Sequence, residues 1–361
     1  MLRLSCHILS RSNIVATVRA TPRRTLHNPH ATTPVQQLSA TNIITARTMS
    51  SSTSTAGPGN VHPLASSAFS TSGESGLYDR ARPSYPPEAL SHIFTALHCS
   101  SSTKSNTNDT GINIIELGAG TGIFSRLLLS PPQDIPKPPS ISKFLAVEPA
   151  VGMRQGFTTS LQKLNIPVGS TGVTGTEVVQ VVNGSFTDIP VPEAWADAII
   201  IAQAFHWSHP NYESTLSSFA RVLRPHAPLI LLWNLEDRSL PEIHPWVPKI
   251  RDAYEAHEVG TPQYRHMWWK KIFELPEFEQ FFDKEYQFEE VKRVLPTTVD
   301  GVVERVLSKS YITALSANDK QAVEEKVRDV VENEKKVWID EGKGVFEYPY
   351  ATDLYVIRRK A

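Results

Sequence analysis

The sequence predicts an α/β protein built on an open, mostly parallel sheet, and two observations lead to this prediction. From about residue 74 onward, short β-branched runs alternate with stretches of helical period, which is typical of parallel strands joined by helices. An apolar strand at 113–117 then turns through three glycines into a helix, and in an open α/β sheet such a turn lies where ligands bind.

Five strands and three helices are expected before residue 235. In the last of these helices Leu216, Phe219 and Leu223 share one face, and Arg224-Pro225 ends it. The element order is that of an open α/β sheet. The expected strands are 113–117, 144–148, 178–182, 198–202 and 229–233, and the expected helices are 122–129, 150–164 and 212–223.

The pattern changes after residue 234. Helices are expected at 240–254 and 317–338, the second with Ser316 and Asp319 in the spacing of a capping box. Two further strands, 286–291 and 350–357, are expected to form a closing pair at one sheet edge. The inserts 246–282 and 296–344 are expected to lie outside the sheet, and the proline-rich stretch 130–140 to form a surface loop.

Residues 1–73 have a different composition from the rest of the chain. They contain six arginines and no lysine, and the first acidic residue is Glu74. Spaced arginines among apolar residues in the first 26 positions are typical of an amphipathic transit peptide. We predict that 1–73 is a disordered leader with a mitochondrial matrix address, and that Met49 could start a cytoplasmic form. The alternative is a disordered tail without an address.

The composition argues against several classes of function. The remaining 288 residues carry 30 basic and 37 acidic side chains, so no basic excess supports nucleic-acid binding. Cys6 and Cys99 are the two cysteines, which permits neither a disulfide framework nor a cysteine zinc site. The histidines show no paired metal-ligand spacing, so no metal is predicted. Apolar runs fall short of the roughly 20 residues of a membrane span. The oligomeric state is not predicted.

The glycine loop discriminates between ligands by its spacing. A dinucleotide fingerprint requires glycine at position 123, where Ile123 stands. Glu116, which ends the strand, would repel a pyrophosphate. A sulfonium ligand with an amino-acid tail fits better, because its ammonium group can approach Glu116. Both residues therefore oppose the alternative of an NAD-dependent dehydrogenase.

A second carboxylate, Glu148, ends the next strand. An acidic side chain at this point of the second βαβ unit is placed to accept hydrogen bonds from both hydroxyls of a ribose. A surface glutamate at a strand end is the alternative. The position of Glu148, one βαβ unit after the glycine loop, favours the ribose role.

These motifs resemble those of a known family. The run ELGAGTG at 116–122 resembles motif I of class I S-adenosylmethionine-dependent methyltransferases with a type 11 domain, and AVEP at 146–149 resembles their second-strand motif. The resemblance covers about 76–235. Segments 78–86, 305–312 and 349–353 resemble the trans-aconitate methyltransferase-like subgroup of small-molecule enzymes.

The resemblance implies a seven-stranded Rossmann-like sheet with helices on both faces and C-terminal inserts that form a substrate cap. Residues 74–361 would form the methyltransferase domain, with 74–235 as the cofactor-binding core and 236–361 as the cap and closing strands. It also implies S-adenosyl-L-methionine as cofactor. The implied cofactor-binding residues are Tyr78, Arg82, Glu116, Gly118, Ala119, Gly120, Gly122, Glu148, Ser185, Phe186 and Gln203.

The implied reaction is methyl transfer to a small-molecule acceptor, with a carboxylic acid as one candidate. His206, just past the fourth strand, is the predicted catalytic residue, because an acceptor that must lose a proton needs a base. The alternative role for His206 is to shape the pocket beside Trp207. A non-catalytic cofactor-binding or assembly protein would show the same cofactor residues, so the sequence leaves that reading open.

Overall fold

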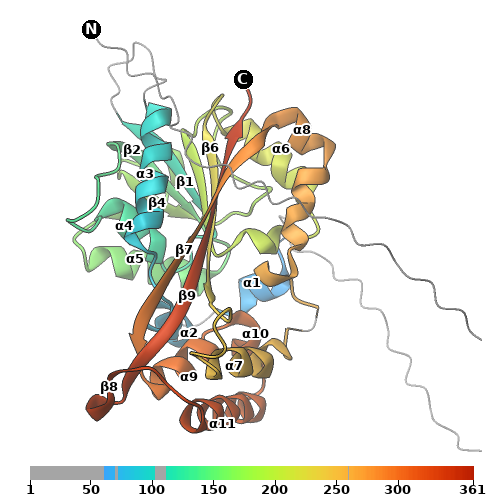
Figure 1. Ribbon diagram of the computed structural model, residues 1–361. Helices are drawn as coiled ribbons and strands as arrows, with labels where there is room; N and C mark the ends of the chain where they lie inside the picture. The colour runs from blue at the N-terminus through green and yellow to red at the C-terminus, as the bar shows by residue number, and fades with distance from the viewer. Residues whose placement is uncertain (1–60, 70–71, 102–110, 259) are drawn as a thin grey trace, which may run out of the picture. The chain divides into compact units, whose positions relative to one another are not determined.

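The computed structural model describes residues 61–69, 72–101, 111–258 and 260–361, and its centre is one nine-stranded sheet (Figure 1). The strand order is β3-β4-β2-β1-β5-β6-β9-β7, and β8 pairs with β9 off this path. Strands β1 to β6 pair in parallel, while β9 runs antiparallel to both β6 and β7. The strands are β1 Ile112–Leu117, β2 Ile141–Val147, β3 Val168–Gly169, β4 Val179–Val182, β5 Ala198–Ala202, β6 Pro228–Glu236, β7 Phe282–Thr297, β8 Trp338–Asp340 and β9 Val345–Arg359.

The open, mostly parallel sheet predicted from the sequence is confirmed. Two short strands, β3 and β8, were not predicted and extend the sheet beyond seven strands. The closing pair β7 and β9 is much longer than expected. Most residues of β7 are exposed. The sequence therefore predicted only the middle of this strand, because its polar ends lack the apolar residues that indicate a strand.

Helices cover both faces of the sheet, as expected. On one face α3, α4 and α5 pack against side chains such as Ile114, Ala146 and Ile200. On the other face α6 and α8 pack against the alternate side chains, such as Ile115 and Ile199. These helices are α3 Pro87–Ser101, α4 Ile123–Leu129, α5 Val151–Gln162, α6 Tyr212–Val222 and α8 Pro276–Phe281.

The C-terminal inserts form a helical layer with its own core beyond the carboxyl end of β6. Buried residues Trp246, Val302 and Val327 join there with Phe346 and Tyr348 at the start of β9. We call this layer the cap (Figure 1). Its helices are α7 Trp246–Glu255, α9 Val299–Leu307, α10 Ser310–Thr313 and α11 Ala317–Asn333.

Two helix boundaries predicted in this region were wrong. The helix expected at 240–254 begins at Trp246, after Pro241 and Pro245, since proline disfavours helical backbone at the residue before it. The helix expected to reach residue 338 ends at Asn333, and Trp338 lies in β8. The predicted cap of this helix is present, since Ser316 Oγ accepts a hydrogen bond from the Asp319 N–H at 3.2 Å.

Ordered structure begins before residue 74, where the sequence placed the domain boundary. Helices α1 (Pro63–Ser67) and α2 (Ser72–Ala81) precede or span that point. Ala68 and Phe69 are buried against Ala150 and Met153. The predicted transit peptide lies outside the described residues and stays a prediction. Within the described ranges, no helix has the length and apolar character needed to cross a bilayer.

Candidate active site

The glycine loop between β1 and α4 has a backbone that only glycine adopts readily. Gly118, Gly120 and Gly122 have φ values of 67°, 56° and 82°, in the left-handed region where other residues are strained. A Cβ atom at Gly118 would lie 2.5 Å from the Ala204 Cβ. The Gly118 N–H donates to the Val147 carbonyl at 2.8 Å, which fixes the loop against the end of β2. The loop therefore presents bare backbone at the carboxyl edge of the sheet.

Glu148 is held by this loop. Its Oε2 accepts a hydrogen bond from the Gly120 N–H and its Oε1 one from the Ala150 N–H, both at 2.9 Å. Burial raises the pKa of Glu148, while these two bonds and Arg154 lower it. Each carboxylate oxygen has a second lone pair. The side chain also lines a cavity, so both oxygens can accept a further hydrogen bond from a ligand.

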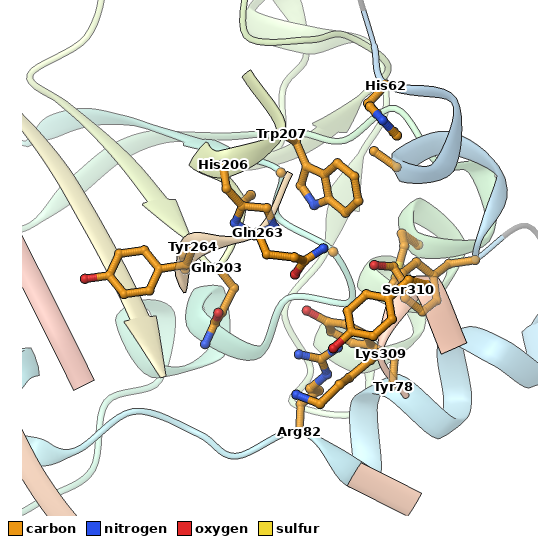
Figure 2. A pocket seen from close by; sticks show the side chains of 18 of the residues that line it. His62, Tyr78, Arg82, Gln203, His206, Trp207, Gln263, Tyr264, Lys309 and Ser310 are labelled. Carbon is orange, nitrogen blue, oxygen red and sulfur yellow. The ribbon is translucent and has the colours of Figure 1, made fainter. Parts of the chain in front are cut away.

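A large cavity lies between the carboxyl edge of the sheet and the cap (Figure 2). Residues of the glycine loop, of the N-terminal segment 61–69 and of α7, α9 and α10 all contribute to its walls. We call it the central cavity. Of the site residues predicted from the sequence, it is lined by Tyr78, Arg82, Gly118, Gly120, Glu148, Ser185, Phe186, Gln203 and His206.

Glu116, Ala119 and Gly122 are the predicted residues that do not line the central cavity. Glu116 and Ala119 line a smaller hollow, which shares Tyr78 and Gln203 with the cavity. Glu116 is buried and accepts a short hydrogen bond from Ser125 Oγ. Burial raises the pKa of Glu116 to about 8. An ammonium group in the hollow would favour the ionised carboxylate, and the predicted contact of Glu116 with the cofactor ammonium stays a prediction.

Arg82 crosses one side of the central cavity. Its guanidinium carbon lies 4.7 Å from the centroid of the Tyr78 ring (Figure 2). Its Nε and Nη2 donate to the side-chain and backbone oxygens of Ser308, at 3.0 and 2.9 Å. Ser308 is neutral, so these bonds orient the guanidinium without neutralising it. Arg82 is therefore suited to an anionic ligand group, such as the carboxylate of a bound amino acid.

The remaining predicted cofactor residues, Ser185, Phe186 and Gln203, differ in the groups that they present to the central cavity. Ser185 Oγ accepts the Asp188 N–H at 3.1 Å and thereby closes a local turn. The Phe186 ring packs edge-on near Phe205, 6.2 Å between centroids. Gln203 has a positive φ and donates from Nε2 to the Asn234 carbonyl at 2.9 Å. Phe186 thus offers an apolar face for a flat ring, whereas Ser185 and Gln203 mainly fix the cavity wall.

His206 is buried in the wall of the central cavity. The Trp233 indole N–H donates to its Nδ1 at 3.3 Å, so the neutral ring carries its proton on Nε2. Burial, with a smaller contribution from Arg82, lowers the pKa of His206 to about 3. The ring is therefore neutral at physiological pH, and its lone pair is already engaged. This tautomer suits a hydrogen-bond donor and opposes the predicted role of general base.

Several lining residues were missed by the sequence analysis. His62 is one of them, and its ring centroid lies 5.0 Å from that of Trp207, the pocket residue already named beside His206. Glu236, Arg305 and Lys309 form a buried charged group on the cap side. Arg305 and Lys309 lie within a segment that resembled the subgroup, but nothing in that motif indicated their role.

The sheet, the glycine loop and the acid after the second strand have the arrangement expected of a class I methyltransferase domain. Residues 115–231 match the model of a family described as a methyltransferase domain. The match confirms the predicted class for this segment and supports S-adenosylmethionine as its cofactor. The residues fit that group, because Glu148 offers two acceptors for ribose hydroxyls and Arg82 a cation for the carboxylate.

Comparison with individual proteins gives partial matches. An uncharacterized methyltransferase of Mycobacterium bovis is 29% identical over 165 residues, which cover 46% of this chain and 52% of that protein. An uncharacterized methyltransferase of Schizosaccharomyces pombe is 28% identical over 184 residues, 51% of this chain and 58% of that protein. The YcgJ protein of Bacillus subtilis is similar in structure, with a TM-score of 0.43, 14% identity, and coverage of 76% of this chain and 99% of that one. The chain thus spans about half the length of the Mycobacterium and Schizosaccharomyces relatives.

Proposed function

We propose that the protein transfers a methyl group from S-adenosylmethionine to a small-molecule acceptor, with a carboxylic acid as one candidate class. The observation that carries this proposal is Glu148. It is buried at the edge of the central cavity and held by the N–H groups of Gly120 and Ala150. In this position it receives the ribose, while Arg82 receives the cofactor carboxylate and Phe186 packs against the adenine.

Methyl transfer from a sulfonium requires alignment of the two substrates more than it requires a reactive side chain. When bound, the cofactor supplies an electrophilic methyl group on a sulfonium. The protein must then hold the acceptor in line with that methyl group and exclude water. Aromatic side chains in the cavity wall, among them Tyr78, Trp207 and Tyr264, serve both purposes. A carboxylate acceptor is already ionised at neutral pH and needs no base.

Two measurements test the proposal on the purified protein. Isothermal titration calorimetry with S-adenosylhomocysteine is expected to show one site per chain. Incubation with S-adenosylmethionine labelled in its methyl group and a small-molecule cell extract is then expected to give a labelled product. Absence of binding would contradict the cofactor site. Binding without a labelled product would favour a non-catalytic cofactor-binding or assembly protein.

Replacing His206 by alanine is expected to lower kcat less than about tenfold at saturating acceptor. The loss of a general base typically lowers turnover by 10²–10⁴, and the Nδ1 lone pair of His206 already accepts from Trp233. The remaining effect would come from a lost hydrogen bond and a changed cavity wall. His92→Ala, on the exposed face of α3, is the matched control. A loss of 100-fold or more in folded protein would restore the general-base role.

A further inference from the structure

A single carboxylate faces two cations on the cap side of the central cavity. Glu236 Oε1, at the end of β6, lies 2.9 Å from Arg305 Nη2 and 3.1 Å from Lys309 Nζ. Glu236 Oε2 accepts a hydrogen bond from the Tyr254 hydroxyl at 3.1 Å. All four side chains are buried. When Lys309 is protonated, the one negative charge of Glu236 cannot neutralise both cations, and the group then carries an excess positive charge.

The other acidic residues of the cavity do not remove this excess. Glu255 is paired with Arg251, whose Nε donates to its Oε1 at 2.7 Å. Glu258 is paired with Arg265, whose Nε donates to its Oε2 at 2.6 Å. The lining of the central cavity contains five basic and four acidic residues. The basic residues are Arg82, Arg251, Arg265, Arg305 and Lys309, and the acidic ones are Glu148, Glu236, Glu255 and Glu258.

Arg305 also has hydrogen-bonding capacity left over. Its Nε and Nη1 are buried, and no atom of the described residues accepts from them with good hydrogen-bond geometry. The Tyr350 hydroxyl is close enough to Arg305 for a weak hydrogen bond that lowers the pKa of the tyrosine, although burial raises this pKa to about 12. Buried guanidinium donors are normally satisfied. A ligand oxygen in the cavity would supply the missing acceptor.

We infer that Arg305 and Lys309 form an anion-binding subsite, and that the methyl acceptor carries a carboxylate or phosphate group which these two residues hold. The inference rests on the proposed function, because it concerns the second substrate of that reaction. The cation left without a partner belongs to Arg305 and Lys309, because Arg251 and Arg265 are paired with Glu255 and Glu258 and Arg82 is assigned to the cofactor carboxylate. An anionic acceptor offsets that charge, whereas a neutral or cationic acceptor does not.

The titration of Lys309 gives the subsite a pH signature. Burial, and then the charge of Arg305, lowers the pKa of Lys309 to about 7, although Glu236 opposes the shift. The other groups that face it are Arg82 and the Tyr254 ring, 4.1 Å away. Lys309 holds the anion only when protonated. The kcat/KM for the acceptor is therefore expected to fall as the pH rises above 7.

The test begins with the wild-type chain and needs no variant. A small-molecule cell extract is separated by anion exchange at neutral pH, and each fraction is assayed for methyl transfer from labelled cofactor. The labelled product is expected from the anionic fraction. Phosphatase treatment of that fraction distinguishes a phosphate acceptor, whose product disappears, from a carboxylate acceptor. A product found only in the non-anionic fraction would overturn the inference and leave the proposed function intact.

Variants then assign the subsite to its residues. Lys309→Met keeps the Arg305–Glu236 pair and is expected to lower kcat/KM for the anionic acceptor by about 10- to 100-fold, as for loss of one hydrogen bond to a charged group. Its affinity for S-adenosylhomocysteine is expected to stay within about twofold of wild type. Lys309→Arg is expected to keep activity and to abolish the decline above pH 7. Lys326→Met, on an exposed face of α11, is the control.

Three results would contradict this assignment. Full activity of folded Lys309→Met would show that the lysine does not hold the acceptor. An equal loss of S-adenosylhomocysteine affinity would show that it holds the cofactor carboxylate instead. A pH profile unchanged in Lys309→Arg would exclude the lysine as the titrating group. Failure of the wild type to bind S-adenosylhomocysteine, or to label any fraction, would refute the proposed function itself.

Discussion

Replacing Glu148 by alanine is expected to weaken the binding of S-adenosylhomocysteine at least about 100-fold. Two ribose hydroxyls would lose a charged acceptor, and a hydrogen bond to a charged group contributes about 1.5–3 kcal/mol. The Gly120 and Ala150 N–H groups would also lose the oxygens that now accept from them at 2.9 Å. The glycine loop would then be held less firmly in the conformation that receives the cofactor.

Isothermal titration calorimetry at 25 °C measures this effect directly. Glu193→Ala changes an exposed loop carboxylate and is expected to bind as the wild type does. Thermal melting of both variants shows whether the fold is retained. A folded Glu148→Ala protein that binds within tenfold of wild type would show that Glu148 does not receive the ribose.

The cofactor side of the site could be read from the sequence because its residues follow consecutive strands. Gly118 and Gly120 come directly after β1, and Glu148 directly after β2. In a parallel sheet the carboxyl ends of neighbouring strands meet at one edge. Sequence order therefore determines which of these residues become neighbours, without any knowledge of the packing.

The residues on the cap side of the cavity could not be predicted from sequence order. Glu236 ends a central strand, whereas Arg305 lies in α9, after the whole β7 strand. Their contact depends on how the inserts pack over the sheet, and no local pattern encodes that packing. Phe69 shows the same limit at the other end of the chain. It is buried, but the serine-rich sequence around it resembles the leader that precedes it.

Replacing Glu236 by glutamine is expected to lower the free energy of unfolding by about 3–5 kcal/mol at pH 7, the usual loss when one partner of a buried ion pair is removed. Arg305 and Lys309 would remain buried without their carboxylate. For a domain of this size the melting temperature would fall by roughly 6–20 °C. Differential scanning calorimetry measures the shift, with Glu285→Gln on the exposed edge of β7 as the control.

The difference in the free energy of unfolding between wild type and Glu236→Gln is expected to depend on pH with a definite sign. Arg305 and Lys309 hold the pKa of Glu236 well below its ordinary value of 4.5. The stabilisation is therefore fully present above about pH 4.5 and is lost as the pH falls toward the folded-state pKa. The gap between wild type and Glu236→Gln is expected to be widest near neutral pH and to narrow in acid. A gap that widens below pH 4.5 would contradict the ion-pair account.

The double variant Glu236→Gln/Lys309→Met separates electrostatics from packing. If the single variant is destabilised because two cations repel each other, removing one of them should recover part of the loss. If instead the loss comes from a poor fit of the glutamine amide beside Tyr254, the second substitution should add to it. The double-mutant cycle is thus expected to give a favourable interaction free energy between Glu236 and Lys309. An additive cycle would show that Lys309 does not interact with Glu236. Competition between Arg305 and Lys309 for Glu236 is also what leaves one cation free for an anionic acceptor.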